Sequence, residues 1–259
     1  MISSTSNTQV KQVIALQTKA KARRESKQFV VEGLRLVSEV PADRLEKLYV
    51  TESFLAEHPE FSEGYYPEIV TDAVMKAMSD TQTPQGILGV VRQQEYTIRE
   101  MCKGEKAPLL LILENLQDPG NLGTIMRTAE AAGVNGVIMS RDTVDIYNPK
   151  VVRSTMGAIF RLPFAYVDDL FGVMEQCRCM GITTYAAHLL GKNTHDLEDY
   201  RKGSAFLIGN EGNGLTDELS QKADVWIRIP MAGQAESLNA AVAAAVLSYE
   251  AARQRGWKL

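Results

Sequence analysis

The feature that most constrains the fold is a regular alternation of apolar runs and helical segments in the second half of the chain. The run LLLILE at 109–114 is almost wholly apolar, which is typical of a strand buried on both faces of a sheet. Five further strand-like runs follow (VNGVIMS, PFAYV, TTYAAH, AFLIGN and VWIRIP), with helical stretches between them, including 148–160 and a long final helix at 237–255. Such alternation predicts an α/β domain with a mainly parallel sheet.

The first 95 residues predict a smaller α/β unit. Helical spacing extends over 10–27, shorter helices are expected at 33–40 and 71–80, and strands are expected at 28–33, 45–51 and 86–93. The polar segment 96–107 carries Gly104, precedes Pro108 and is expected to be a linker. The predicted organisation is therefore a small domain at 1–95, a linker at 96–107 and a larger domain at 108–259.

Composition narrows the class of protein. Apolar residues make up 45% of the chain and charged residues 23%, which is ordinary for a globular protein with a real core. No apolar run approaches the roughly 18 residues that would suggest a membrane span. The start MISSTSNTQVKQ lacks the apolar region of a secretory signal. These features predict a cytoplasmic protein.

Few residues could hold a metal ion or form a hydrolytic triad. The chain has three cysteines and three scattered histidines, namely Cys102, Cys177, Cys179, His58, His188 and His195. The cysteines form no CxxC pair and no zinc spacing, so reduced structural thiols are expected. We therefore expect no metal site and no Ser-His-Asp triad.

The N-terminal segment is locally basic although the formal net charge of the chain is −4. Its basic run consists of Lys19, Lys21, Arg23, Arg24 and Lys27. A run of this kind can contact the phosphates of a nucleic acid even on an acidic protein, or it can be a solvated helix face. Charge alone favours neither interpretation.

Three segments at expected strand ends are rich in Gly, Asn, Glu and Ser: 114–133, 208–215 and 229–241. Singly, each has a simple structural interpretation as a turn or a helix cap. Together they repeat one pattern of strand, polar loop and helix. Because ligands of open α/β sheets bind at the carboxyl ends of the strands, the three loops could converge on one pocket.

The known nucleotide-binding fingerprints do not describe this pocket. The segment 209–214 reads GNEGNG rather than GxGxxG, and no P-loop motif occurs. The first strand of the larger domain also lacks a Gly-rich turn after it. A nicotinamide enzyme is therefore excluded, and a nucleotide-like ligand would be held by backbone groups of several loops.

The same three segments resemble the signature motifs of the SpoU branch of the SPOUT RNA methyltransferases. They match N…DPGNLGTI.RTA…G, GNEG.GL and IPM….SLN.A.A in order and spacing over roughly 130 residues. The resemblance implies an RNA 2′-O-ribose methyltransferase that uses S-adenosylmethionine, works as a homodimer and ties its C-terminal segment into a deep trefoil knot. The N-terminal stretches FVVEGLRLVSEV and TPQGILGVV are similar to the small substrate-binding domain of members that act on rRNA.

The resemblance also implies site residues. The positions that match catalytic residues are Asn121, Arg127, Glu211, Ser237 and Asn239. The positions that match the cofactor-binding loops are Gly209, Asn210, Gly214, Ile229, Met231 and Leu238. The basic run described above would bind RNA.

The chemistry of Arg127 has two interpretations. A ribose 2′-hydroxyl is a weak acid, so its proton must be removed or its developing charge stabilised. The family arginine is often given the role of general base, yet a guanidinium has a pKa above about 12 and rarely loses its proton. Arg127 could instead hold the RNA phosphate next to the target ribose and stabilise the forming alkoxide.

The sequence thus predicts an rRNA 2′-O-methyltransferase. A tRNA 2′-O-methyltransferase is the alternative within the same class, and the N-terminal domain favours rRNA because tRNA-acting relatives often lack it. An inactive RNA-binding relative is the alternative outside the class, and the intact motif residues argue against it.

Overall fold

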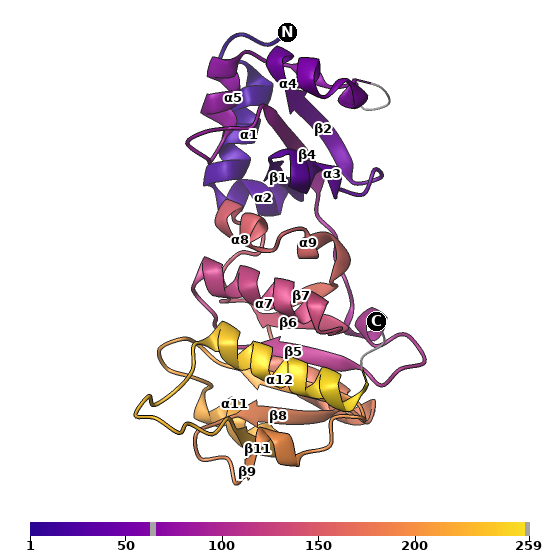
Figure 1. Ribbon diagram of the computed structural model, residues 1–259, viewed down its shortest axis with the longest axis vertical. Coiled ribbons are helices and arrows are strands. Elements are labelled where there is room, and N and C mark those ends of the chain that lie inside the picture. Colours follow the sequence, from indigo (N-terminus) through magenta and orange to yellow (C-terminus); the bar gives the residue numbers. More distant parts are fainter. Residues whose placement is uncertain (63–65, 257–259) are drawn as a thin grey trace. The chain divides into compact units, whose positions relative to one another are not determined.

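The computed structural model describes residues 1–62 and 66–256, which form two compact units (Figure 1). The first unit contains residues 1–94 and 145–160, and the second contains the remainder of the chain. None of the helices in these described residues is long and apolar enough to cross a membrane.

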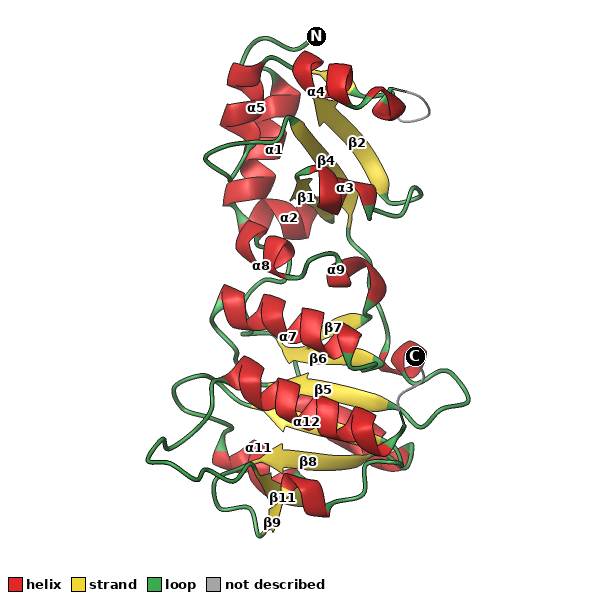
Figure 2. Cartoon of the chain, in the orientation of Figure 1, coloured by secondary structure: helices red, strands yellow, loops and turns green. Residues whose placement is uncertain are grey.

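The second unit is built on a seven-stranded sheet in which every strand pair is parallel, as predicted (Figure 2). Its order is β7-β6-β5-β10-β8-β11-β9. The strands are β5 Leu109–Leu113, β6 Gly136–Ser140, β7 Phe164–Val167, β8 Thr183–Ala187, β9 Asn193–Thr194, β10 Ser204–Ile208 and β11 Val225–Arg228. All side chains of β5 and β10 are buried, because helices cover both faces of the sheet.

The helices divide between the two faces of this sheet. One face is covered by α6 Ile98–Met101, α10 Leu170–Cys179 and α11 Asp217–Lys222, whose apolar residues share one cluster with alternate residues of β5 and β10. The helices α7 Pro119–Ala131 and α12 Ala240–Gln254 pack against each other, and α12 also contacts β10. The knot implied by the resemblance stays a prediction.

Part of the expected linker belongs to the core of the second unit. Thr97 and Glu100 form a capping box that begins α6, and the two apolar residues of that single turn, Ile98 and Met101, are buried. Met101 packs closely on Gly136, because a Cβ at Gly136 would lie only 2.5 Å from the Met101 sulfur. Most residues around this turn are polar, so a prediction from composition does not reveal that its two apolar residues are buried.

The first unit has a four-stranded sheet of order β1-β4-β2-β3, with β4 antiparallel to β1 and β2, and β3 parallel to β2. Its strands are β1 Gln28–Glu32, β2 Leu45–Val50, β3 Glu68–Ile69 and β4 Ile87–Arg92. The helices before residue 95 are α1 Thr8–Thr18, α2 Ala20–Ser26, α3 Leu34–Ser38, α4 Glu52–Glu57 and α5 Asp72–Met78. The helix expected at 10–27 is two helices, because Lys19 between them is extended (φ −124°, ψ 112°).

The segment 145–160 contributes α8 Pro149–Ser154 and the start of α9 Ala158–Arg161 to the first unit, although the sequence analysis placed it in the larger domain. Tyr147 packs on Phe29 of β1 with ring centroids 4.7 Å apart. The single helix expected at 148–160 is interrupted because Met156 and Gly157 have positive φ values of 50° and 84°. Residues beyond 108 thus complete the core of the first unit.

Candidate functional site

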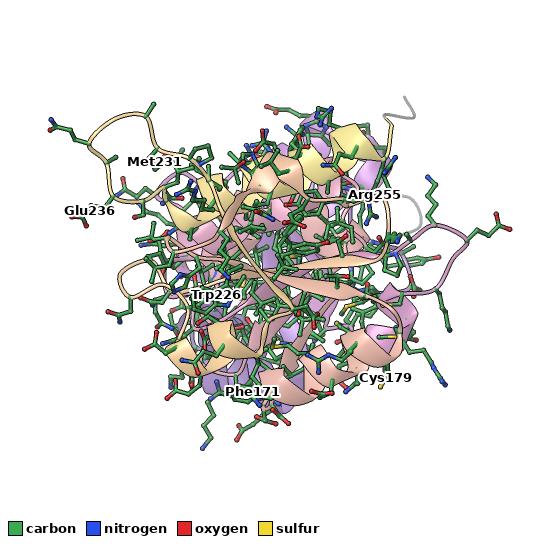
Figure 3. The ribbon with its side chains drawn as sticks, turned by 90° about the horizontal axis from the view of Figure 1, so that it is seen from below. Phe171, Cys179, Trp226, Met231, Glu236 and Arg255 are labelled. Carbon is green, nitrogen blue, oxygen red and sulfur yellow. The ribbon has the colours of Figure 1, made fainter. Side chains whose placement is uncertain are left out.

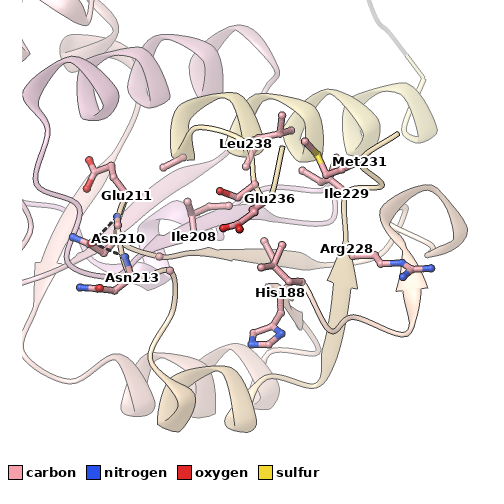
Figure 4. A pocket seen from close by; sticks show the side chains of 18 residues that line it. His188, Ile208, Asn210, Glu211, Asn213, Arg228, Ile229, Met231, Glu236 and Leu238 are labelled. Atoms are coloured by element: carbon pink, nitrogen blue, oxygen red, sulfur yellow. Dashed lines mark hydrogen bonds between the residues drawn. The ribbon is translucent and has the colours of Figure 1, made fainter. Parts of the chain in front are cut away.

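A pocket of about 290 Å³ lies at the carboxyl edge of the second unit's sheet (Figure 4). Its walls come from the chain that follows β8, β10 and β11 and from the start of α12. Because these strands are parallel, the loops after them meet at one edge of the sheet. Met231 and Glu236 extend at this edge, and Arg255 lies at the opposite one (Figure 3).

The turn after β10 requires glycine at its first position. A Cβ on Gly209 would lie 2.0 Å from the carbonyl carbon of Gly214, so the two backbone segments can approach only without it. Asn210 and Gly214 exchange two backbone hydrogen bonds of 3.0 and 2.9 Å, and Gly214 has a φ of +70°. The Asn210 Oδ1 accepts hydrogen bonds from the amides of Gly212 and Asn213, which closes the turn.

Glu211, in the same turn, binds the loop that follows β5. Its carboxylate accepts hydrogen bonds from the amides of Asp118 (2.9 Å) and Gln117 (3.1 Å) and from the Asn121 Nδ2 (3.1 Å). Partial burial raises the pKa of Glu211, but these hydrogen bonds lower it by more, so the net pKa lies below its ordinary value. Glu211 is therefore a carboxylate near neutral pH.

Asn121 and Asn239 extend this connection to the third motif. The Asn239 Nδ2 donates to the Asn121 Oδ1 at 2.9 Å, while the Asn239 Oδ1 caps α12 by accepting from the amides of Ala241 and Val242. A chain of side-chain hydrogen bonds thus runs from Glu211 through Asn121 to Asn239. It joins the three loops that the sequence singled out.

The structure brings together most of the residues that the resemblance singled out. The six cofactor-type positions all line the pocket, namely Gly209, Asn210, Gly214, Ile229, Met231 and Leu238. Glu211 and Ser237 line it as well, whereas Asn121 and Asn239 are joined to it through Glu211. Arg127 is exposed on α7, outside the pocket lining, and makes no hydrogen bond or ion pair with any residue that the structure describes.

The sequence analysis missed one wall of the pocket. Ala187 at the end of β8 lines it, with His188 and Leu189 directly after this strand. Arg228 at the end of β11 and Glu236 line it as well. The strand run TTYAAH indicated where β8 ends, so the rule that ligands bind at strand ends could have found this wall.

The predicted RNA-binding residues lie at α2 and its ends, and one of them has a different role. Lys19, Lys21, Arg24 and Lys27 are exposed. Arg23 is only 4% exposed, pairs with Asp145 at 2.8 Å and donates to the carbonyl of Leu16 at 2.7 Å. The prediction that Arg23 binds phosphate is corrected, because its guanidinium is already occupied inside the first unit.

Within the described residues there is no group of three or more His, Cys, Asp or Glu side chains that could hold a metal ion. The pocket offers backbone groups, apolar walls, the two carboxylates of Glu211 and Glu236 and the guanidinium of Arg228. This is the lining of a site for an organic ligand with an apolar part and charged groups.

Comparisons with known proteins agree with this arrangement. Residues 108–249 match the SpoU rRNA methylase family, and residues 7–89 match the MRM3-like substrate binding domain. A Bacillus subtilis protein named 23S rRNA (guanosine(2553)-2′-O)-methyltransferase RlmP is 34% identical over 257 residues, covering 96% of this chain and 97% of that protein.

Two solved structures are similar over nearly the whole chain. The SpoU methyltransferase AviRb from Streptomyces viridochromogenes, in complex with the cofactor AdoMet, superposes with a TM-score of 0.86 at 28% identity, covering 96% of this chain and 98% of that one. An AdoMet-bound rRNA methyltransferase from Sinorhizobium meliloti gives a TM-score of 0.84 at 32% identity, covering 97% of each chain. With its three motif loops joined around one pocket, the chain belongs to the SpoU rRNA methylase family.

Proposed function

We propose that this protein transfers the methyl group of S-adenosylmethionine to a ribose 2′-oxygen of ribosomal RNA. The observation that carries the proposal is the hydrogen-bonded chain Glu211–Asn121–Asn239, which joins the three motif loops beside the pocket. A pocket whose loops are fixed in this way is preorganised, so little ordering is needed when a ligand binds.

The pocket fits this cofactor in size and chemistry. Its volume of about 290 Å³ is near the lower end of the range of small-molecule sites. Ile208, Ile229 and Leu238 provide apolar walls for an adenine ring, and the carboxylates of Glu211 and Glu236 favour a cation. When bound, S-adenosylmethionine supplies a methyl group activated by the positive sulfonium.

The roles of the protein's own residues follow from their contacts. Three donors already occupy the Glu211 carboxylate, so we assign it to anchoring the loops rather than to accepting a proton. Arg127 is exposed and makes no hydrogen bond or ion pair with any residue that the structure describes, so its guanidinium is available to the RNA. We therefore propose that Arg127 clamps the RNA phosphate and stabilises the forming alkoxide, with Ser237 placing a short polar group at the pocket.

The first unit is proposed to bind the RNA. The exposed Lys19, Lys21, Arg24 and Lys27 would contact phosphates, with a salt dependence that reflects the number of contacts. Since residues 145–160 complete its core, the proposed RNA-binding domain comprises 1–94 and 145–160 rather than 1–95 alone. We further propose a cytoplasmic homodimer as the working unit, which sedimentation of the purified protein would test.

The experiment that tests this function measures labelled methyl transfer into separated rRNA and tRNA from cells that lack the protein. Wild type should label rRNA. Arg127→Ala and Arg127→Lys should both lose roughly 100-fold in single-turnover rate while binding cofactor normally, because Lys lacks the planar fork. Labelling of tRNA alone would support the other substrate class, and no labelling despite cofactor binding would indicate an inactive RNA-binding relative.

A further inference from the structure

We propose that His188 is a positioning residue for the cofactor: its imidazole fixes the loop at 187–190 that forms one wall of the pocket. The residue is outside the three motif segments, and it does not belong to the hydrogen-bonded chain that joins them. This inference rests on the proposed function only for the identity of the ligand. Three observations support it.

The first observation is that the backbone of this loop is attached to β11. The amide of His188 donates to the carbonyl of Ile227 at 2.9 Å, and the amide of Gly191 donates to the carbonyl of His188 at 3.0 Å. A Cβ on Gly191 would lie 2.5 Å from the carbonyl carbon of Ile227. The loop is therefore fixed at both ends against the strand that leads into another wall of the pocket.

The second observation is that two independent contacts hold the imidazole. Its Nδ1 accepts a hydrogen bond from the amide of Leu190 at 3.1 Å, which assigns the remaining ring proton of the neutral imidazole to Nε2. One ring face lies on the indole of Trp226, with centroids 4.3 Å apart and planes at 31°. The indole is fixed in turn, because its Nε1 donates to the carbonyl of Ser220 at 2.6 Å.

The third observation concerns what this loop presents to the ligand. Leu189 lines the pocket and is 64% exposed, which is a large free apolar surface for a side chain in a binding site. In Figure 4 the His188 imidazole lies at the edge of the pocket and points away from Leu238 and Met231. His188 is thus placed to act through the loop, holding Leu189 where an apolar part of the cofactor can cover it.

Two substitutions separate the two contacts. His188→Phe retains a flat ring against the indole but removes the acceptor for the Leu190 amide. His188→Asn retains an acceptor for the amide two residues ahead but removes the ring. The matched control is His58→Asn in the first unit, because His58 also stacks on an aromatic ring (Phe54, 4.6 Å) and also makes a hydrogen bond through Nδ1.

The measurements are the Kd for S-adenosylmethionine by calorimetry and the steady-state KM and kcat. We expect His188→Phe to raise Kd and cofactor KM by about 3- to 10-fold, as the loss of one hydrogen bond does. His188→Asn should recover at least half of that change on a logarithmic scale. For both variants, kcat at saturating cofactor should stay within about twofold of wild type, and His58→Asn should leave every value unchanged.

Several outcomes would overturn the proposal. An unchanged Kd in His188→Phe would do so, even if the variant melted at a lower temperature, because His188 would then be structural only. A fall in kcat with Kd unchanged would also refute it. The Kd comparison needs no RNA, so a wild-type protein that binds cofactor but methylates no RNA would refute the proposed function and still decide the role of His188.

Discussion

Replacing Asn121 with aspartate should break the chain of hydrogen bonds around the pocket by reversing a single interaction. The Asn121 Nδ2 donates to the Glu211 carboxylate at 3.1 Å, and in Asn121→Asp a second carboxylate would face it there. The acceptor for Asn239 is retained, because an aspartate oxygen replaces the amide oxygen at the same position. The substitution therefore changes charge and donor capacity with almost no change in shape.

The magnitude follows from the distance. Two unit charges 3.1 Å apart repel by about 1.3 kcal/mol in a water-like dielectric and by about 5 kcal/mol at an effective value of 20. Because the Glu211 side chain is exposed, the repulsion energy should be close to the lower of these two values. The lost hydrogen bond adds about 1 kcal/mol to the destabilisation. We expect the free energy of unfolding to fall by about 2–3 kcal/mol near pH 7 and the cofactor Kd to rise about tenfold.

The pH dependence has a definite sign. In wild type the pKa of Glu211 is lowered on folding, so its stabilising contribution is present above the unfolded value and is lost as pH falls through the folded pKa. In Asn121→Asp the paired carboxylates raise each other's pKa, so protonation relieves the repulsion in acid. The difference in unfolding free energy between the two proteins should therefore be largest near pH 7 and smallest near pH 4.

Urea denaturation at several pH values, with calorimetry for the cofactor, measures these changes. Asn193→Asp is the matched control, since the Asn193 Nδ2 also donates to a glutamate, Glu198, in the same unit, and neither residue is part of the pocket lining. The double variant Asn121→Asp with Glu211→Gln should recover part of the stability, because the new amide can donate to the new carboxylate but can no longer accept from the Asp118 amide at the same atom. Equal losses of cofactor affinity in Asn121→Asp and Asn193→Asp would refute the reasoning.

Two further predictions concern the same unit. Gly209→Ala should abolish cofactor binding by calorimetry, because its Cβ would lie 2.0 Å from the backbone of Gly214, whereas Gly233→Ala, whose Cβ would meet nothing within 4 Å and which is not part of the pocket lining, should bind normally. Arg255 donates to four backbone carbonyls, so Arg255→Met should lower the unfolding free energy by about 2–4 kcal/mol in a denaturation experiment, while Arg253→Met, which removes an exposed guanidinium paired with Glu250, should lower it much less.

The parallel sheet and the pocket loops could be predicted because each requires a recognisable local sequence pattern. A strand covered on both faces is apolar throughout, as at 109–113, and a loop that approaches another backbone needs glycine, as at Gly209. The resemblance singled out Asn121, Glu211 and Asn239 but not the hydrogen bonds that join them. Asn121 and Glu211 are far apart in the sequence, and the residues around each of them do not indicate that their side chains form a hydrogen bond.

Two features could not be predicted because they depend on which surfaces pack together. Helical spacing at 148–160 indicates an apolar face but not the sheet that it covers, and Tyr147 packs on Phe29 of the first unit. Likewise, a basic run gives no sign that Arg23, unlike its neighbours, has a buried partner in Asp145, 122 positions further along the chain. In both cases the missing information is a long-range contact.

The central claim is tested most directly by the chemical position of the transferred methyl group. The purified protein is incubated with S-adenosylmethionine and rRNA from cells that lack it, and the RNA is digested to nucleosides and analysed by mass spectrometry. We predict a single methylated nucleoside with the methyl group on the ribose 2′-oxygen, formed roughly 100-fold more slowly by Arg127→Ala. A methyl group on a base, or no methylated nucleoside from a protein that binds the cofactor, would contradict the account.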